Sequence, residues 1–396
     1  MSLHLSSVIK HFSGTLLGLS GCVTFLAVDS LLSSSSSFAA EKFVVRYGLF
    51  EQSLPVEDLR KYAETQQVSS DLNSFLRYLN PKQQQRLQQV LHVNMSLDIV
   101  AVDKLLDTSL GKMLLSAASK SVTRRDKAGI QALRSAIILG TKSREGLGII
   151  SFLKAYPSEK LVVDLPQALE ILNQSKLYSS SSNASQNTPQ KDNLTSTPLW
   201  QIQTQYQRLA SQGKQFSGCL FGDSVSAQLG NSLGEGTFNF ALNGLSSISL
   251  VEQLKSLAQG NVKCQKTIIA VGGNDALYGV SNELLTEKLK EAISLVRGMG
   301  TKEIFLIPAF YSTVAASKDP TVAAPQSKVE EINTVINQVA TTENVSVQSS
   351  GIQSLYENNV LKDNLTSDGD HLNAEGLKIY RQALLEILAS GSANKN

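Results

Sequence analysis

The chain has 396 residues, enough for two domains that could each bury a full core. Its composition, 42% hydrophobic and 18% charged, is typical of a globular protein that folds in water. The formal net charge is only +2 and no long basic run occurs. We therefore expect neither a nucleic-acid partner nor strong electrostatic attraction to a membrane surface.

Residues 1–40 have the order of a secretory signal. Lys10 lies in a start without acidic residues, Phe12–Val28 is uncharged and largely apolar, and small residues follow. Two alternatives stay open. Leu19–Cys22 resembles a lipoprotein signal box, in which Cys22 would carry a lipid that tethers the protein to a membrane, and the apolar run is just long enough for an uncleaved anchor. We expect an exported protein of the periplasm or cell envelope.

Residues 41–175 contain several amphipathic stretches, which favour a mostly α-helical domain. Apolar residues recur at helical spacing in Asp71–Leu79, Pro81–Leu91 and Asp126–Leu139. Pro81 suits the first position of a helix, because its missing N–H would have no intrahelical partner there. Since this zone shows neither paired carboxylates nor metal-ligand spacing, we expect a docking or substrate-presenting role rather than a second catalytic site.

Residues 176–199 are rich in Ser, Asn and Gln and have too little apolar surface to fold, so they are predicted to be a linker. A second domain, residues 200–390, begins with a short helix over Trp200–Ala210 and then alternates apolar runs with helical stretches. The predicted strands are Cys219–Phe221, Phe238–Leu242, Thr267–Val271, Ile304–Pro308 and Val345–Val347. The predicted helices are Ser249–Ala258, Asn282–Arg297, Gln326–Ala340 and Ala374–Ala389. Uninterrupted apolar strands that alternate with helices indicate a parallel sheet covered on both faces, with its active site beyond the carboxyl ends of the strands.

Cys219 and Cys264 fall on predicted neighbouring strands whose ends are marked by Gly222 and Gly272. They lie three and eight residues before those glycines, which is a five-residue offset. At about 3.3 Å per residue the stagger is roughly 16 Å, well beyond the separation of about 7 Å that a disulfide can bridge. The sequence therefore predicts two free thiols.

Ser224 follows the first of these strands, in Gly222-Asp223-Ser224, at a turn that leads towards a helix. Alone, this tripeptide is more often an ordinary turn. His371 is the only histidine of the second domain, and Asp368 precedes it by three residues. A serine needs a base to take its proton, and the base needs a partner on its other ring nitrogen, so one Asp-x-x-His loop can supply both.

The loop that carries His371 is predicted to be pinned to the last helix, because Asn373 is a good N-cap residue. Asp370 is expected to point away into solvent. Oxyanion donors are expected from the ends of two other strands. Asn274 follows the third strand in Gly272-Gly273-Asn274-Asp275, and Gly244 follows the second in a stretch that begins at Asn239.

These four blocks resemble those of the SGNH (GDSL-type) hydrolases over about residues 216–390. The resemblance implies a flavodoxin-like three-layer α/β/α fold with a five-stranded parallel sheet, an esterase activity, and no cofactor. It implies that Ser224 is the nucleophile, His371 the general base and Asp368 its orienting partner, with oxyanion donors at Ser224, Gly244 and Asn274. Val225 and Ser247 depart from the family pattern, the latter beside the oxyanion donors. Residues 41–172 are similar to a helical domain of unassigned function that precedes the catalytic domain of exported bacterial α/β-hydrolases.

Three functional hypotheses follow. The first is hydrolysis of acyl or acetyl esters of a carbohydrate or lipid, and the second is transfer of the acyl group to an envelope polysaccharide through the same site. The third is a non-catalytic envelope scaffold, which the presence of all four blocks disfavours. A metal-dependent route is disfavoured because one histidine without a carboxylate cluster is a poor zinc site. The long connection Pro308–Lys328, rich in Ala and Val, is expected either to line an acyl pocket or to be a surface loop.

Overall fold

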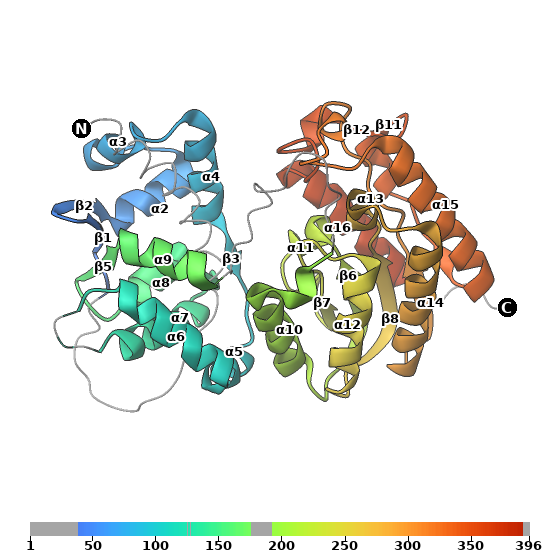
Figure 1. Ribbon diagram of the computed structural model, residues 1–396, viewed down its shortest axis with the longest axis horizontal. Helices are drawn as coiled ribbons and strands as arrows, with labels where there is room; N and C mark the ends of the chain where they lie inside the picture. Colours follow the sequence, from blue (N-terminus) through green and yellow to red (C-terminus); the bar gives the residue numbers. More distant parts are fainter. Residues whose placement is uncertain (1–38, 125, 127, 176–191, 391–396) are drawn as a thin grey trace. The chain divides into compact units, whose positions relative to one another are not determined.

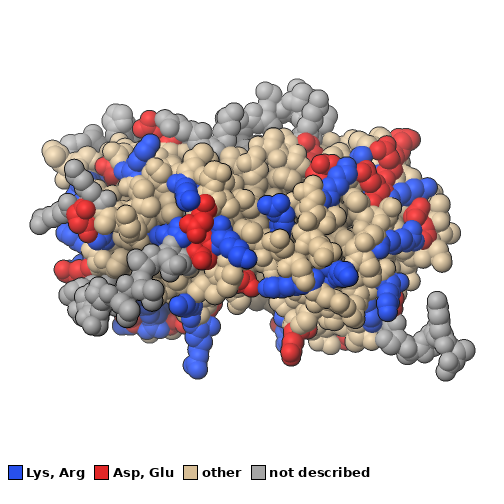
Figure 2. Space-filling model, turned by 90° about the horizontal axis from the view of Figure 1, so that it is seen from below, with Lys and Arg blue, Asp and Glu red and all other residues tan. Residues whose placement is uncertain are grey.

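The computed structural model describes residues 39–390 apart from residues 125, 127 and 176–191. The predicted signal region with Cys22, and most of the predicted linker, lie outside the described residues. The chain divides into two compact units, Met1–Ser179 and Ser180–Asn396 (Figure 1). Acidic and basic side chains are interspersed over the face drawn in Figure 2. Among the described helices, none is both long and apolar enough to cross a membrane.

The N-terminal unit is mostly helical, as predicted. Its helices are α2 (Val56–Thr65), α3 (Ser70–Leu76), α4 (Pro81–His92), α5 (Ile99–Asp107), α6 (Ser109–Ser121), α7 (Gly129–Thr141), α8 (Ile149–Ala155) and α9 (Leu165–Ser175). Pro81 is the first residue of α4, and the preceding Asn80 forms a capping box with Gln83 through two hydrogen bonds of 2.9 Å. The three amphipathic stretches predicted from the sequence therefore correspond to α3, α4 and α7.

This unit also contains a three-stranded sheet that helical periodicity did not predict. The sheet has the order β2-β1-β5, with β1 (Lys42–Tyr47) antiparallel to β2 (Phe50–Pro55) and parallel to β5 (Lys160–Asp164). The runs Phe43–Val45 and Leu161–Val163 are short and rich in valine, a β-branched residue that packs well on a pleated surface. A two-residue pair, β3 (Asn94–Met95) with β4 (Leu147–Gly148), joins distant parts of the unit.

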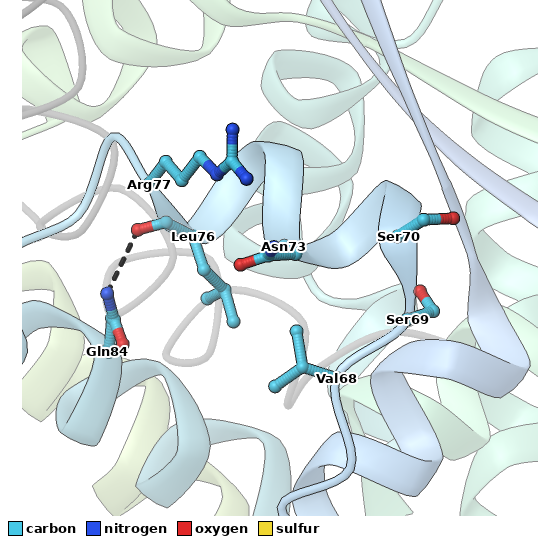
Figure 3. Close-up of a pocket in the computed structure, with 7 residues that line it drawn as sticks. All are labelled: Val68, Ser69, Ser70, Asn73, Leu76, Arg77 and Gln84. Atoms are coloured by element: carbon cyan, nitrogen blue, oxygen red, sulfur yellow. Dashed lines mark hydrogen bonds between the residues drawn. The ribbon is translucent and has the colours of Figure 1, made fainter.

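A pocket of about 450 Å³ opens on this unit beside α3 and α4 (Figure 3). Its lining consists of Val68, Ser69, Ser70, Asn73, Leu76, Arg77 and Gln84. The Gln84 side-chain amide donates to the Leu76 carbonyl at 3.0 Å, which ties the two helices together at the pocket wall. The lining has hydrogen-bonding groups and one guanidinium, but no histidine, cysteine or carboxylate.

The C-terminal unit is a three-layer α/β/α domain, as predicted. Its main sheet has five strands, all parallel, in the order β10-β9-β8-β6-β7, which is the flavodoxin-like order. The strands are β6 (Gln215–Gly222), β7 (Thr237–Asn239), β8 (Lys263–Ala270), β9 (Glu303–Leu306) and β10 (Ser346–Val347). A separate antiparallel pair is formed by β11 (Tyr356–Glu357) and β12 (Val360–Leu361). The helices are α10 (Pro198–Ser211), α11 (Ser224–Ala227), α12 (Ser247–Ala258), α13 (Gly273–Tyr278), α14 (Asn282–Gly298), α15 (Gln326–Glu343) and α16 (Ala374–Ser390).

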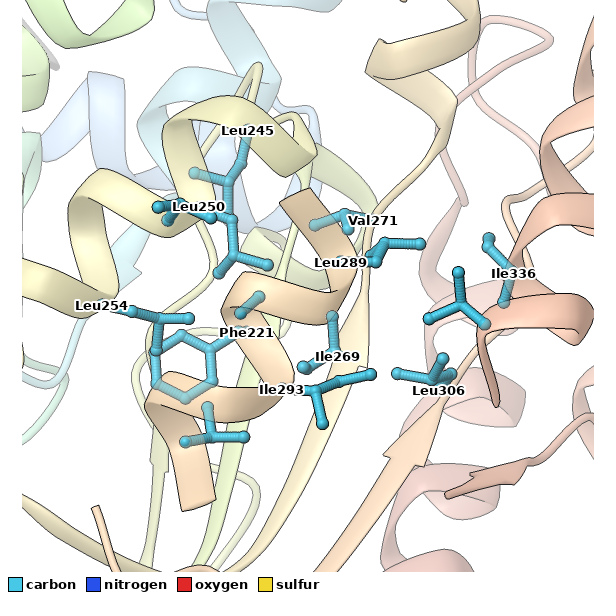
Figure 4. Close-up of a cluster of buried hydrophobic side chains, with 14 of the residues drawn as sticks. Phe221, Leu245, Leu250, Leu254, Ile269, Val271, Leu289, Ile293, Leu306 and Ile336 are labelled. Atoms are coloured by element: carbon cyan, nitrogen blue, oxygen red, sulfur yellow. The ribbon is translucent and has the colours of Figure 1, made fainter. Parts of the chain in front are cut away.

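Alternation along the strands divides the core of this unit between the two sheet faces. Phe221 and Ile269 point into a cluster closed by α12, α14 and α15, much of which Figure 4 shows. Leu220 and Ile268 point into a second cluster closed by α16. All four side chains are 2% exposed or less. Because both faces are covered there, the carboxyl-terminal halves of β6 and β8 are buried and almost wholly apolar, and this is why they stood out in the sequence.

The structure contradicts the expected pair of free thiols, because Cys219 and Cys264 form a disulfide with their Cα atoms 5.9 Å apart. The expectation assumed that the glycines after the two strands lie level with each other. Instead the register places Gly222 opposite Ala270, so that Cys219 lies opposite Thr267. The offset between the two cysteines is therefore three positions rather than five.

The pairing of β6 with β8 is interrupted at one position between the two cysteines. Phe216 lies opposite Cys264 and Gly218 opposite Lys266 in the same register, but Ser217 and Gln265 between them do not pair. Phe216 and Cys219 both pack against the same buried cluster, although positions three apart on a regular strand point to opposite faces. Cys264 belongs to that cluster too, so both sulfurs lie on one side of the sheet. The error came from the register and not from the placement of the strands.

We predict that the double variant Cys219→Ala/Cys264→Ala lowers the free energy of unfolding by about 4 kcal/mol. The bond joins residues 45 apart in the sequence, and its loss restores conformational freedom to the unfolded chain. Urea denaturation of both proteins, with and without reductant, measures the difference. Reductant should shift the midpoint of the wild type and leave that of the variant unchanged. Alkylation of Cys219 or Cys264 in denatured, unreduced protein would contradict the disulfide.

Candidate active site

Ser224 lies at the carboxyl end of β6, where the sequence placed it. The strand ends at Gly222, and Asp223 caps the short helix α11 by accepting from the Val225 N–H at 3.1 Å. A Cβ on Gly222 would lie only 2.5 Å from the Cβ of Ser226, so the turn from strand to helix has no space for a side chain. The turn therefore directs Ser224 out of the sheet edge.

Neighbouring buried hydrogen bonds fix this turn. The Ser226 hydroxyl lies 2.9 Å from the Tyr380 hydroxyl on α16, and both residues are fully buried. The side-chain amide of Asn239, at the end of β7, donates to the Ser226 carbonyl at 2.8 Å and to the Gly230 carbonyl at 2.7 Å. Asn239 is thus a positioning residue for the serine turn, whereas the sequence analysis marked it only as the start of the stretch that leads to Gly244.

His371 and Asp368 reach Ser224 from the loop before α16. The His371 Nε2 atom lies 2.9 Å from Ser224 Oγ, and its Nδ1 atom lies 3.0 Å from Asp368 Oδ2. The other carboxylate oxygen of Asp368 accepts from the backbone N–H of His371 at 2.8 Å and of Asp370 at 3.0 Å. The structure therefore brings the three residues predicted from the sequence into one hydrogen-bonded chain.

Backbone and side-chain bonds hold the histidine loop against α16. The Thr366 hydroxyl donates to the His371 carbonyl at 2.6 Å and accepts from the Gly369 N–H at 2.8 Å. Asn373 precedes the first residue of α16, and its side-chain oxygen accepts from the Gly376 N–H at 3.1 Å. Asn373 therefore caps the helix as predicted, while the part played by Thr366 was not foreseen.

The pKa values of Asp368 and His371 favour a negatively charged carboxylate beside a positively charged imidazole ring. The hydrogen bond to Asp368 raises the pKa of His371 above its ordinary value of 6.5, and partial burial opposes that rise only in part. Burial acts to raise the pKa of Asp368, but the hydrogen bonds from the His371 ring and backbone outweigh it and hold that pKa well below its usual range. The carboxylate can therefore stabilise a positive imidazole ring.

Asn274 and Gly244 lie on neighbouring connections at the same sheet edge. Asn274 is in α13, directly after β8, and its side-chain amide donates to the Leu245 carbonyl at 3.2 Å. The Tyr278 hydroxyl donates to the Gly244 carbonyl at 3.2 Å, and Gly244 has a positive φ of 80°. Within the described part of the chain, the backbone N–H groups of Ser224 and Gly244 have no acceptor. They are therefore free to bind an anion.

A buried carboxylate that sequence reasoning missed fixes the same loop. Asp275 is completely buried and accepts from the Ser247 N–H at 3.0 and 3.1 Å and from the Ser247 hydroxyl at 2.5 Å. Burial raises the pKa of Asp275 to about 6, against the opposing effect of the bonds from Ser247. Ser247, noted in the sequence only as a departure from the family pattern, is the first residue of α12 and anchors the Gly244 loop to α13.

Asp370 is placed differently from the expectation. It is half-buried rather than solvated, and with Asp223, Ser224 and Asn274 it lines a cavity of about 40 Å³. Burial raises the pKa of Asp223 to about 7, although the Val225 N–H lowers it, and burial also raises the pKa of Asp370. The loop residues on both sides of Asp370 are held by Asp368 and Thr366, and the resulting tight turn directs the neighbouring carboxylate inwards.

The connection between β9 and α15 forms much of the cavity wall. Phe310, Ser312 and Val322–Ala324 line it together with the serine turn. Of the two alternatives left open for this connection, the structure therefore supports a pocket lining.

Comparison with known proteins finds a separate family match within each of the two units. Residues 39–164 match the family described as an alpha/beta hydrolase of unknown function, and residues 212–379 match the GDSL-like lipase/acylhydrolase family. No curated protein matches the chain.

Two solved structures illustrate the similarity. A GDSL-like lipase from Bacteroides thetaiotaomicron is 15% identical, with 44% of this chain and 88% of that chain covered and a TM-score of 0.36. The lipase/acylhydrolase from Enterococcus faecalis is 18% identical, with 46% and 99% covered and a TM-score of 0.36. The match over residues 212–379 identifies the C-terminal unit as a GDSL-like lipase/acylhydrolase domain, and a domain of this family supports an ester-hydrolysing enzyme.

Proposed function

We propose that the protein hydrolyses carboxylic esters through an acyl-enzyme formed on Ser224. The observation that carries the proposal is the continuous chain from Ser224 Oγ through both ring nitrogens of His371 to Asp368, with steps of 2.9 and 3.0 Å. Both distances are within the range for proton transfer between hydrogen-bonded groups. Since a serine hydroxyl is a weak nucleophile until a base takes its proton, this geometry supplies what the serine lacks.

In the first half of the reaction, Ser224 Oγ attacks the ester carbonyl while His371 Nε2 takes its proton. A new Oγ–carbon bond forms, and the negative charge moves to the carbonyl oxygen. Asp368 stabilises the positive imidazole ring and keeps its Nδ1–H directed towards the carboxylate. The carbon–oxygen bond to the alcohol then breaks, and His371 gives its proton to the departing alcohol. Water repeats the sequence in the second half and releases the acid.

The oxyanion is bound by the Ser224 and Gly244 backbone N–H groups and the Asn274 side-chain amide. Removing one such donor in other acyl-transfer enzymes costs roughly 10²–10³ in rate. Here the donors belong to three separate connections, and hydrogen bonds of Asp275 and Tyr278 join the two that carry Gly244 and Asn274. Donors held in this way before substrate binds meet the condition for strong electrostatic stabilisation.

A fluorophosphonate probe should label wild-type protein at Ser224. Ser224→Ala should abolish the labelling and lower the rate of ester hydrolysis on the order of 10⁶-fold, because the nucleophile is gone. Nitrophenyl acetate turnover and peptide mapping of the labelled protein measure both effects. The matched control is Ser217→Ala, which removes an exposed serine from β6, the strand that leads to Ser224. This variant should retain both the labelling and the ester hydrolysis. Undiminished turnover by Ser224→Ala would refute the proposed mechanism.

The pH profile of kcat/KM should depend on His371, which must be neutral to act as the base. Because Asp368 raises the pKa of His371 above 6.5, the acid limb of the wild-type profile should lie above that pH. Asp368→Asn removes the charge that favours the protonated ring, so the limb should move to lower pH, with a loss of roughly 10⁴-fold in kcat. The control Asp363→Asn lies at an exposed position of the same loop region, and should change neither the position of the acid limb nor kcat. A limb that stays in place in Asp368→Asn would contradict this pairing.

We further propose that the enzyme acts outside the cytoplasm, in the periplasm or cell envelope. The buried Cys219–Cys264 disulfide supports this, because disulfides form and persist mainly in oxidising compartments. The sequence of residues 1–40 supports it independently, with either cleavage of a signal or lipidation of Cys22.

Cell fractionation followed by intact-mass measurement should find the mature protein in the envelope or periplasmic fraction, shortened at its N-terminus. Cleavage before Cys22 with added lipid mass, abolished by Cys22→Ser, would identify a lipoprotein. Cleavage near residue 40 would identify a released enzyme. A cytoplasmic protein that still begins at Met1 would rule out export.

A further inference from the structure

The cavity beside Ser224 has an apolar wall. The connection between β9 and α15 contributes Phe310, Val322, Ala323 and Ala324, and α13 contributes Leu277. Of these, Ala323 and Ala324 are buried, and Val322 is partly exposed at the edge. Val322 can therefore be substituted at the solvent side of the wall, while Ala323 and Ala324 form its buried inner part.

Hydrogen bonds and ring contacts hold this wall in place. The Asn333 side chain on α15 accepts from the Ala309 N–H at 2.7 Å and donates to the Ala309 carbonyl at 3.2 Å. The Phe310 ring packs edge-on against Tyr380 with centroids 4.9 Å apart, and Tyr380 is fully buried. The Ser312 carbonyl accepts from the Leu361 N–H at 3.3 Å. The space beside Ser224 is therefore bounded by residues anchored to the core.

The size of this space limits what can enter it. The cavity measures about 40 Å³, and one water needs at least about 10–15 Å³ on this scale. It thus accepts roughly three water-sized groups, whereas sites for drug-sized ligands measure about 300–1,000 Å³. An acetyl group, with its carbonyl and one methyl, fills such a space, and a longer alkyl chain would have to extend beyond it.

Polar groups on the cavity wall strengthen this limit. The Ser312 hydroxyl, on a residue only 3% exposed, lines the cavity and has no hydrogen-bond partner among the described residues. Asp370 and Asp223 place carboxylates on the same cavity. An alkyl chain that pressed against these three groups would remove water from them without offering a hydrogen bond, which is unfavourable.

We propose that this cavity is a binding pocket for short acyl groups, of acetyl or propionyl size, which makes the enzyme an esterase of short-chain esters. The proposal rests on the acyl-enzyme mechanism at Ser224, because that mechanism places the acyl group beside the cavity. The alcohol portion of the substrate leaves from the open side, so the cavity sets no limit on its size.

A series of nitrophenyl esters from acetate to octanoate tests the pocket. The wild type should show the highest kcat/KM for acetate or propionate and lose about tenfold or more for each methylene that the pocket cannot hold. A kcat/KM that stays level or rises towards octanoate would overturn the proposal. Labelling of Ser224 by the fluorophosphonate probe in the same preparation separates the two ideas, since a labelled enzyme that prefers octanoate refutes only the pocket.

Two matched valine variants on the same connection locate the effect. Val322→Ala removes two methyl groups from the cavity wall and should raise the ratio of butyrate to acetate turnover by about tenfold. Val314→Ala makes the same change at an exposed position that does not line the cavity, and should leave the ratio unchanged. An unchanged ratio in Val322→Ala, or an equal change in both variants, would contradict the assignment of this wall.

Discussion

The hydrogen bond between Ser224 and His371 joins two residues that are 147 positions apart in the chain, and their side chains must meet within a few tenths of an ångström. One partner lies on a strand-to-helix turn and the other on the loop before the last helix. The parallel sheet makes the meeting possible, because all its strands end at one edge. Gly222 lets the first turn be tight, and Asn373 fixes where α16 begins. A shift of one residue in either place would separate the pair.

The oxyanion side of the site depends on a buried charge. Asp275 is fully buried, and an isolated carboxylate in such surroundings would be strongly destabilised. Ser247 compensates through its N–H and hydroxyl, at the beginning of a 12-residue helix whose N-terminus favours a negative charge. This arrangement links the Gly244 loop to α13, the helix that carries Asn274. The main role of the Asp275 carboxylate is thus to position the Gly244 loop against α13. The hydrogen bonds from Ser247 offset the cost of burying its charge, so its net effect on folding is small.

Features that depend on local sequence were predictable, and features that depend on register were not. The Asp368–His371 pair could be recognised because three residues span one turn, and the strands of the C-terminal domain could be recognised because both sheet faces are buried. The disulfide was missed because the register of β6 against β8 was misjudged by two positions, and because the interruption that turns Phe216 and Cys219 to the same face has no signal in the sequence. The contact of Asp275 with Ser247 spans 28 residues between two connections, and no local pattern indicates it.

The polar groups of the cavity connect stability with selectivity. The unpaired hydroxyl of Ser312 lowers the stability of the free protein, since a buried group without a partner costs about 1–3 kcal/mol. An apolar wall distinguishes acyl groups by size, at only about 10–200-fold per methylene, whereas polar groups that must be satisfied distinguish ligands by chemistry and far more strongly. A site that combines both rejects a long alkyl chain for two reasons, its volume and its lack of hydrogen bonds. Selectivity for the acyl group therefore depends on the connection between β9 and α15, which lines the cavity. The groups that bind the oxyanion make the same contacts with every ester.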